Sequence, residues 1–417
     1  MDQLKDVLTT RGRAFVAAGI TLALSGWALG FPDISRVGVL LLCLPVVTGV
    51  LARRQRASVR VERHLQPARV SVDQPATVTV LMENTGARRT PLLLAEEHLD
   101  YVLGDRPRFL LGRMAPGERR QVQYDVRAHL RGRRALGPLT VQLRDPFGLT
   151  TRFAQVGETS DIVVLPRIEA LTEGRPPGEG VGAEGEIPHM VALHGEDDQS
   201  IREYRDGDDL RRIHWPATAR TGDLMVRQED RPARRRAVLV LDPRADGHRG
   251  SGTGSSFEWA VTAVASMVAH LSAFGYAIHL ISAETVHDGR AALTTEPEQA
   301  LDILAEAVTG PGHQLEELVR AAHQVTAQGG LVVAVLADRD EEVLRQVASL
   351  RQPGSTGLAM VIETATFADG RRSPSPQAAE TFAEVLRTAG WSATTVRSGH
   401  RVVDVWSALT TKGVLSR

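Results

Sequence analysis

The first 56 residues carry two long apolar runs, at positions 14–31 and 37–52, joined by the turn sequence FPDISR. As helices they would extend roughly 27 Å and roughly 24 Å at about 1.5 Å per residue, close to the thickness of about 30 Å of a bilayer's hydrocarbon core. Basic residues precede the first run and follow the second, at Lys5, Arg11, Arg13, Arg53, Arg54 and Arg56. Because positive residues stay on the cytoplasmic side, residues 1–56 are predicted to form a transmembrane hairpin of the inner or plasma membrane, with both ends in the cytoplasm. A cleaved signal peptide fits less well, because a second apolar run follows without a clear small-x-small cleavage site.

Between residues 57 and 170, apolar and polar residues alternate in short runs such as ATVTVLMENT, LTVQL and DIVVLP, separated by Gly, Pro and Asn. A period of two with frequent turn residues predicts an antiparallel β-sandwich domain. The Asn-Thr-Gly and Ala-Pro-Gly-Glu turns resemble those that precede pairing strands in immunoglobulin-like modules. The segment DPFGL predicts a tight turn anchored by a buried Phe147. Residues 171–186, rich in Gly, Pro and Glu, are expected to form a flexible linker.

Residues 187–417 form the last predicted domain, in which unbroken apolar strands alternate with amphipathic helices. Strands are expected at 237–242, 277–282, 331–337, 357–363 and 392–397. Helices are expected at 257–274, 298–308, 315–327, 341–350 and 377–389. Strands that are apolar on both faces are typical of a parallel sheet covered by helices on both sides. The predicted fold class is therefore multidomain: a helical hairpin, a β-sandwich and an α/β parallel sheet.

The net charge and the cysteine count limit the partners and the covalent links that we expect. The formal net charge is -1, so the chain lacks the positive field that attracts polyanions, and nucleic acid is not an expected partner. The single cysteine, Cys43, leaves no intrachain disulfide.

Residues 201–230 are dense in charge, with arginines and aspartates on both sides of a His-Trp pair. Neither helical nor strand periodicity accounts for this density. The segment resembles the signature of a bacterial family known as domain of unknown function 58, through Tyr204, Gly207, Asp208, Arg212, Ile213, His214, Trp215, Ala219 and Arg220. The resemblance implies that the last domain is of the von Willebrand factor A type. Because family members are frequently encoded beside MoxR-type AAA+ ATPases, it also implies work with such an ATPase.

Two accounts explain this segment. In the structural account Asp208 caps a helix over 210–218, His214 and Trp215 anchor that helix against the sheet, and arginines pair with aspartates. This account explains most of the motif, but the arginines exceed what local pairing needs, and arginines beside an aromatic are typical of docking surfaces. The candidate interaction residues are Tyr204, Arg205, Asp208, Arg211, Arg212, His214, Trp215 and Arg220. A catalytic role for His214 as acid or base lacks a partnered nucleophile.

The end of the first strand of the last domain is a weak candidate metal site. Domains of the resembled type often carry Asp-x-Ser-x-Ser there, and this chain has Asp242-Pro-Arg-Ala-Asp. Asp242 matches the first ligand, but Arg244 adds an opposing charge where a serine is needed. Asp338 ends another strand and is the second weak candidate. We therefore expect Mg²⁺ to bind weakly or not at all, and no other cofactor.

The glycines at 250–254 lack the lysine that a phosphate-binding loop requires. Ser255 or Ser256 is expected to cap the helix that follows. The scattered histidines, including His248, do not stand at metal-ligand or catalytic spacing.

The sequence thus favours a membrane-anchored cytoplasmic scaffold or adaptor rather than an enzyme. The resemblance implies that it acts with a MoxR-type AAA+ ATPase in protein-complex assembly or envelope-related chaperoning. The alternative is a metal-dependent hydrolase that uses Asp242 and Asp338.

Overall fold

The computed structural model describes residues 6–54, 58–145, 147–172, 200–203, 213, 215–228, 235–327, 329–339, 341–353, 355–368 and 377–411. The chain clusters into two compact units. The first comprises Met1–Ile168 with the short segments Ser251–Thr253 and Leu301–Val308, and the second comprises Glu169–Gly250, Gly254–Ala300 and Thr309–Arg417. Most of the predicted linker, from residue 173 to its end at 186, lies outside the described residues.

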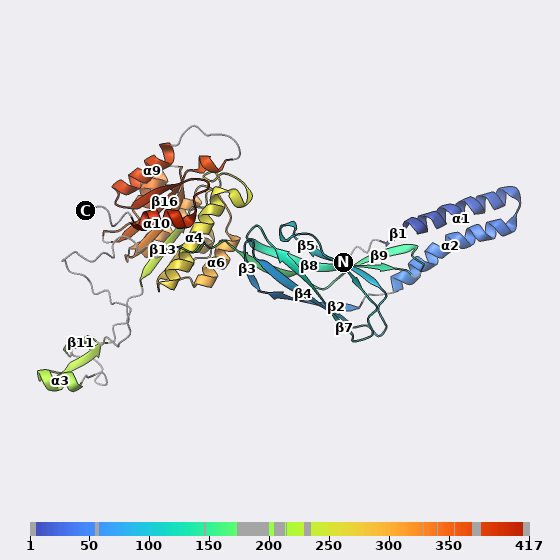
Figure 1. The fold of residues 1–417 in the computed structure, drawn as a ribbon, viewed down its shortest axis with the longest axis horizontal. Coiled ribbons are helices and arrows are strands. Elements are labelled where there is room, and N and C mark those ends of the chain that lie inside the picture. Colours follow the sequence, from blue (N-terminus) through green and yellow to red (C-terminus); the bar gives the residue numbers. More distant parts are fainter. Residues whose placement is uncertain are drawn as a thin grey trace. The chain divides into compact units, whose positions relative to one another are not determined.

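Two apolar helices stand near the N-terminus, α1 (Thr10–Leu29) and α2 (Pro32–Arg54), and both are long enough to cross a membrane (Figure 1). The predicted turn FPDISR is wrong in extent, because α2 already begins at Pro32. Gly30 ends α1 in the left-handed conformation with a φ of 75°, which costs glycine nothing. Proline is well suited to the first position of a helix, so two residues suffice to reverse the chain.

The buried residues of α1 are Gly12, Gly19 and Gly26. The last two face α2. A Cβ added at Gly19 would lie 2.8 Å from Cγ of Leu42, and one added at Gly38 would collide with the backbone nitrogen of Ala23. Small residues at these positions let the helix backbones approach closely.

A β-rich region follows, as predicted, and it is built from two sheets. One sheet contains three antiparallel strands, β2 (Val59–Gln66), β4 (Pro75–Asn84) and β7 (Arg119–Arg127). The other contains β1 (Asp6–Leu8), β3 (Arg69–Ser71), β5 (Leu93–Leu99), β6 (Arg108–Leu111), β8 (Gly132–Arg144), β9 (Thr150–Val156) and β10 (Ser160–Leu165). Val80 and Met82 of β4 share one hydrophobic core with Leu139 and Val141 of β8. The pairing of β3 with β10 is parallel, which the prediction of an antiparallel domain did not include.

The turn after Asp145 is not anchored by Phe147, whose side chain is 58% exposed, so that prediction is wrong. Among the described residues of this turn, Asp145 and Leu149 are buried. The Asp145 carboxylate accepts hydrogen bonds from the Phe147 N–H at 2.7 Å, from the Thr150 hydroxyl at 2.7 Å and from the Thr150 N–H. A buried carboxylate with three donors fixes the turn without the aromatic ring.

The second unit contains the predicted parallel sheet, in the strand order β14-β13-β15-β16-β17. These strands are β13 (Arg236–Leu241), β14 (Ala277–Ile281), β15 (Leu331–Ala337), β16 (Thr356–Ile362) and β17 (Ser392–Val396). Every residue of β15 is buried, as expected of a strand covered on both faces.

Helices cover both faces of this sheet. Helix α4 (Ser256–Ala273) packs on β13 and on α10 (Val402–Thr411). On the other face α7 (Gln314–Thr326), α8 (Glu341–Ala348) and α9 (Gln377–Thr388) share a core with alternate residues of the strands, such as Val238 and Val240. Helix α6 (Pro297–Glu306) was predicted, whereas α10 and the short α5 (Ala283–His287) were not.

Candidate functional site

The charged segment lies between two short strands that pair with each other. β11 (Ser200–Glu203) and β12 (Met225–Gln228) are antiparallel. Between them the structure describes α3 (Trp215–Thr221). The hydroxyl of Thr218 accepts a hydrogen bond from the Met225 N–H at 3.0 Å, so α3 is tied to the start of β12. The pairing of these strands therefore brings the two ends of the segment together.

Helix α3 has no buried residue, and Trp215 is 66% exposed. The expectation that Trp215 anchors a helix against the sheet is therefore wrong. A helix of seven residues has little surface on which to bury an indole ring. Arg220, in the last turn of α3, is exposed as well. Six other candidate residues lie outside the described residues: Tyr204, Arg205, Asp208, Arg211, Arg212 and His214.

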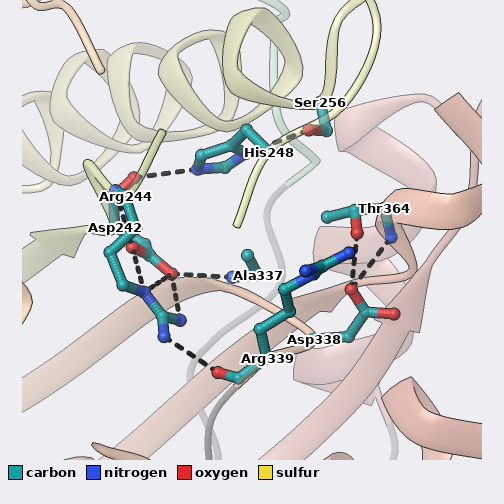
Figure 2. Close-up of polar contacts among 8 residues, drawn as sticks. All are labelled: Asp242, Arg244, His248, Ser256, Ala337, Asp338, Arg339 and Thr364. Atoms are coloured by element: carbon teal, nitrogen blue, oxygen red, sulfur yellow. Dashed lines mark hydrogen bonds and ion pairs between the residues drawn. The ribbon is translucent and has the colours of Figure 1, made fainter. Parts of the chain in front are cut away.

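A second polar cluster lies at the edge of the sheet where β13 and β15 end (Figure 2). Asp242 directly follows β13 and Asp338 directly follows β15, and these strands are neighbours. The sequence thus placed both carboxylates correctly at one edge of the sheet. Asp338 accepts hydrogen bonds from the N–H of Thr364 at 3.2 Å and from its hydroxyl at 2.7 Å.

The carboxylate of Asp242 is fully buried and bound by Arg244 (Figure 2). The guanidinium donates from Nε at 2.9 Å to one oxygen and from Nη2 at 2.7 Å to the other. The N–H groups of Arg244 and Ala337 donate to the same carboxylate, at 3.1 Å and 3.0 Å. The third guanidinium nitrogen, Nη1, donates to the carbonyl of Arg339 at 2.9 Å. The guanidinium is thereby held on three sides.

These residues do not fit a metal site. A divalent ion needs several converging oxygens, and both oxygens of Asp242 are already bound to a fixed positive charge. Within the described ranges, no three His, Cys, Asp or Glu side chains gather in a way that could hold a metal ion. The sequence identified Arg244 as an opposing charge. In the structure its guanidinium also occupies the carboxylate of Asp242, which is the residue that would be the first metal ligand.

The same edge contains a His–Ser pair that the sequence did not reveal. Nε2 of His248 lies 2.9 Å from the carbonyl oxygen of Asp242, and Nδ1 lies 3.0 Å from Oγ of Ser256. Because a carbonyl only accepts, Nε2 carries the proton and Nδ1 accepts from the serine hydroxyl. Burial lowers the pKa of His248, although the negative charge of Asp242 opposes this shift. The imidazole is therefore held neutral.

This pair is not arranged for nucleophilic catalysis. Ser256 is fully buried, and the carboxylate of Asp242 binds Arg244 rather than the imidazole. Ser256 also accepts a hydrogen bond from the Arg249 N–H at 2.9 Å, so it fastens the loop before α4. The neighbouring Ser255 caps α4 by accepting from the Glu258 N–H at 3.2 Å, as expected for one of these two serines.

Residues 200–335, from the start of β11 into β15, match the family model described as "Protein of unknown function DUF58". This match confirms the predicted resemblance to the domain of unknown function 58 family over that stretch. The match joins the exposed Trp215 segment and the Asp242 edge in one family unit. No curated protein matches the chain.

Solved structures give only slight likenesses. An alkylpurine DNA glycosylase of Pseudomonas fluorescens is 15% identical over 32% of this chain and 38% of its own, with a TM-score of 0.19. The CARDB domain of a Pyrococcus furiosus protein is 17% identical over 26% of this chain and 94% of its own, also with a TM-score of 0.19. A putative ApaA protein of Bordetella pertussis is 16% identical over 25% of this chain and 91% of its own, with the same TM-score. Scores this low support no argument on fold or function.

Proposed function

We propose that this DUF58 protein is a membrane-anchored cytoplasmic scaffold or adaptor that acts with a MoxR-type AAA+ ATPase in protein-complex assembly or envelope-related chaperoning. The observation that carries the proposal is the 66% exposure of Trp215 on a helix that buries nothing. An exposed tryptophan and the exposed Arg220 in the last turn of the same helix are the residue types that dominate binding energy at protein interfaces. Docking through this segment therefore accounts for side chains that the fold does not bury.

The membrane anchor is α1 with α2. Their outward side chains include Trp27 at 82% and Leu24 at 61% exposure, a surface suited to acyl chains and unsuited to water. Basic residues around the start of α1 and at the end of α2 favour a hairpin with both ends, and both later domains, in the cytoplasm.

We also propose a fold type for the β-rich region and for the second unit. We assign the β-rich region to the immunoglobulin-like sandwiches, because its two sheets share one core. We assign the second unit to the von Willebrand factor A type, because Asp242 and Asp338 stand at the carboxyl edge of a parallel sheet covered on both faces. The ATPase partner rests on the family resemblance alone.

The metal-dependent hydrolase is the less supported alternative. It requires Asp242 to bind a metal ion, and Arg244 competes for both oxygens of that carboxylate. It also requires water to reach a side chain that is fully buried.

Affinity purification of the full-length protein from native membranes, read by mass spectrometry, tests the proposal. We expect an AAA+ ATPase to co-purify with the wild type and to be lost with Trp215→Ala. The matched control is Tyr101→Ala, which removes an 87% exposed aromatic from the β-rich region. Equal ATPase recovery with all three proteins would refute docking at Trp215, and its absence from the wild-type sample would refute the partnership.

A further inference from the structure

The exposed ring of Phe147 belongs to a turn that is fastened to the first residues of α1. The N–H of Thr9 donates to the Leu149 carbonyl at 3.0 Å, and its hydroxyl donates to the Gly148 carbonyl at 2.7 Å. The same hydroxyl caps α1 by accepting from the Gly12 N–H at 3.1 Å. Strand β1, directly before Thr9, pairs with β9, directly after the turn. The turn and the start of α1 therefore form one rigid junction.

Two glycines mark the level of this turn along the two helices. Gly12 packs against the Leu149 carbonyl, where a Cβ would collide with the oxygen. On the other helix a Cβ at Gly49 would lie 3.8 Å from Cγ2 of Thr150. Both glycines stand where the apolar part of their helix meets basic residues: the exposed Arg11 and Arg13 flank Gly12, and Arg53 follows Gly49 by four residues, about 6 Å along the axis.

We infer that the turn after Asp145 is a membrane-interface anchor, in which the ring of Phe147 enters the boundary between phospholipid headgroups and acyl chains. This inference rests on the proposed membrane insertion of α1 and α2. Arginines at the ends of membrane helices lie among the headgroups, so a turn that touches Gly12 lies at that depth too. Phenylalanine favours this boundary over water.

The turn is built to present the ring rather than to bury it. Asp145 and Leu149 face inward, and the carboxylate of Asp145 accepts hydrogen bonds from the N–H of Phe147 itself. Leu8, at the end of β1 and 38% exposed, adds a second apolar side chain next to the junction. The occupant is the lipid surface, because the junction is continuous with two helices whose exposed faces are apolar.

Spin labelling of the full-length protein in phospholipid vesicles tests this inference. Cys43 is the only cysteine, so a Cys43→Ser background accepts single labels at Phe147→Cys, Leu24→Cys and Tyr101→Cys. Leu24 is an exposed residue in the second half of α1, within its apolar run, and Tyr101 lies near Leu136, in the part of β8 remote from Asp145. Collisions of each nitroxide with oxygen, which concentrates in lipid, are compared with collisions with a water-soluble nickel chelate.

We expect the ratio of oxygen to nickel collisions at position 147 to lie between the high ratio at 24 and the low ratio at 101. A ratio at 147 equal to that at 101, with a high ratio at 24, would overturn the interface anchor and leave the membrane hairpin intact. A low ratio at 24 would overturn both. Protection of position 147 from both reagents would show that protein, not lipid, covers the ring, and would also overturn the inference.

Discussion

The guanidinium of Arg244 binds both carboxylate oxygens of Asp242, two residues before it in the chain. The pair is almost fully buried, with 5% of the arginine side chain and none of the aspartate side chain exposed. The positive charge that neutralises the carboxylate at the end of β13 is therefore that of Arg244. The loop that follows is held by this pair and by the contacts of His248.

Removing the carboxylate should destabilise the second unit strongly. Asp242→Ala leaves the charge of Arg244 buried without its partner, which costs about 3–5 kcal/mol in comparable pairs. For a unit of this size that corresponds to a fall in melting temperature of roughly 6 °C or more, measured by calorimetry of the full-length protein in detergent. Asp246→Ala, an exposed position in the same loop, is the control and should change the melting temperature little.

Magnesium should bind the wild type weakly or not at all, and Arg244→Ser should improve its binding. The substitution removes the opposing charge and supplies a hydroxyl next to the carboxylate of Asp242. Isothermal titration of both proteins with Mg²⁺ provides the measurement. Micromolar affinity in the wild type that disappears with Asp242→Ala would contradict this account and favour the hydrolase.

Acidification should destabilise the second unit through His248. Burial lowers the pKa of this imidazole in the folded state, whereas the unfolded chain keeps a value of about 6.5. The unfolded state therefore binds more protons below that pH, so the stabilisation is complete above pH 6.5 and is lost as the pH falls toward the folded-state pKa. Burial lowers the pKa of His279 in the same direction.

The contribution of His248 to this pH dependence is measured by comparing the melting temperatures of the wild type and a variant between pH 8 and pH 5. The wild type should melt at progressively lower temperature below pH 6.5. His248→Gln should melt lower than the wild type at pH 8 and lose less on acidification, with His279 accounting for part of the slope that remains. Parallel curves for the two proteins would show that His248 is not held neutral.

Replacing each of the two glycines of α2 with alanine should change the stability of the hairpin differently. Alanine normally stabilises a helix by up to about 1 kcal/mol relative to glycine. Gly38→Ala should nevertheless destabilise the hairpin, because its Cβ would collide with the backbone of Ala23, whereas Gly49→Ala meets only an ordinary contact. The temperature at which the full-length protein leaves detergent solution on heating is the readout. If both variants behave alike, close packing at Gly38 is not required.

The regular elements could be predicted because their signals are long and local. The two apolar helices and most strands of the parallel sheet lie in continuous apolar runs of the sequence. Strand β1 has three residues and pairs with β9, more than 140 positions away, so no local pattern marks it. The bounds of α2 were missed because Asp33 and Arg36 read as turn residues, although they form an ion pair on the surface of the helix.

The polar contacts could be predicted only in part. The order of strands brought Asp242 and Asp338 to one edge, because parallel strands end together. The binding of Arg244 to that carboxylate depends on a tight turn after β13, which composition does not specify. Phe147 was predicted to be buried because it is aromatic, but hydrogen bonds to Asp145 fix the turn instead. The exposure of Trp215 likewise follows from the shortness of α3.

The central claim is that Trp215 belongs to a docking surface for an AAA+ ATPase. The most direct test is the dissociation constant between the full-length protein in lipid nanodiscs and the MoxR-type ATPase of the same organism, measured for the wild type and Trp215→Ala together with their melting temperatures. The account predicts a loss of affinity of roughly thirty-fold or more, which is about 2 kcal/mol, with the melting temperature unchanged because the ring is exposed. Unchanged affinity beside a clearly lowered melting temperature would contradict it and would make the tryptophan part of the architecture.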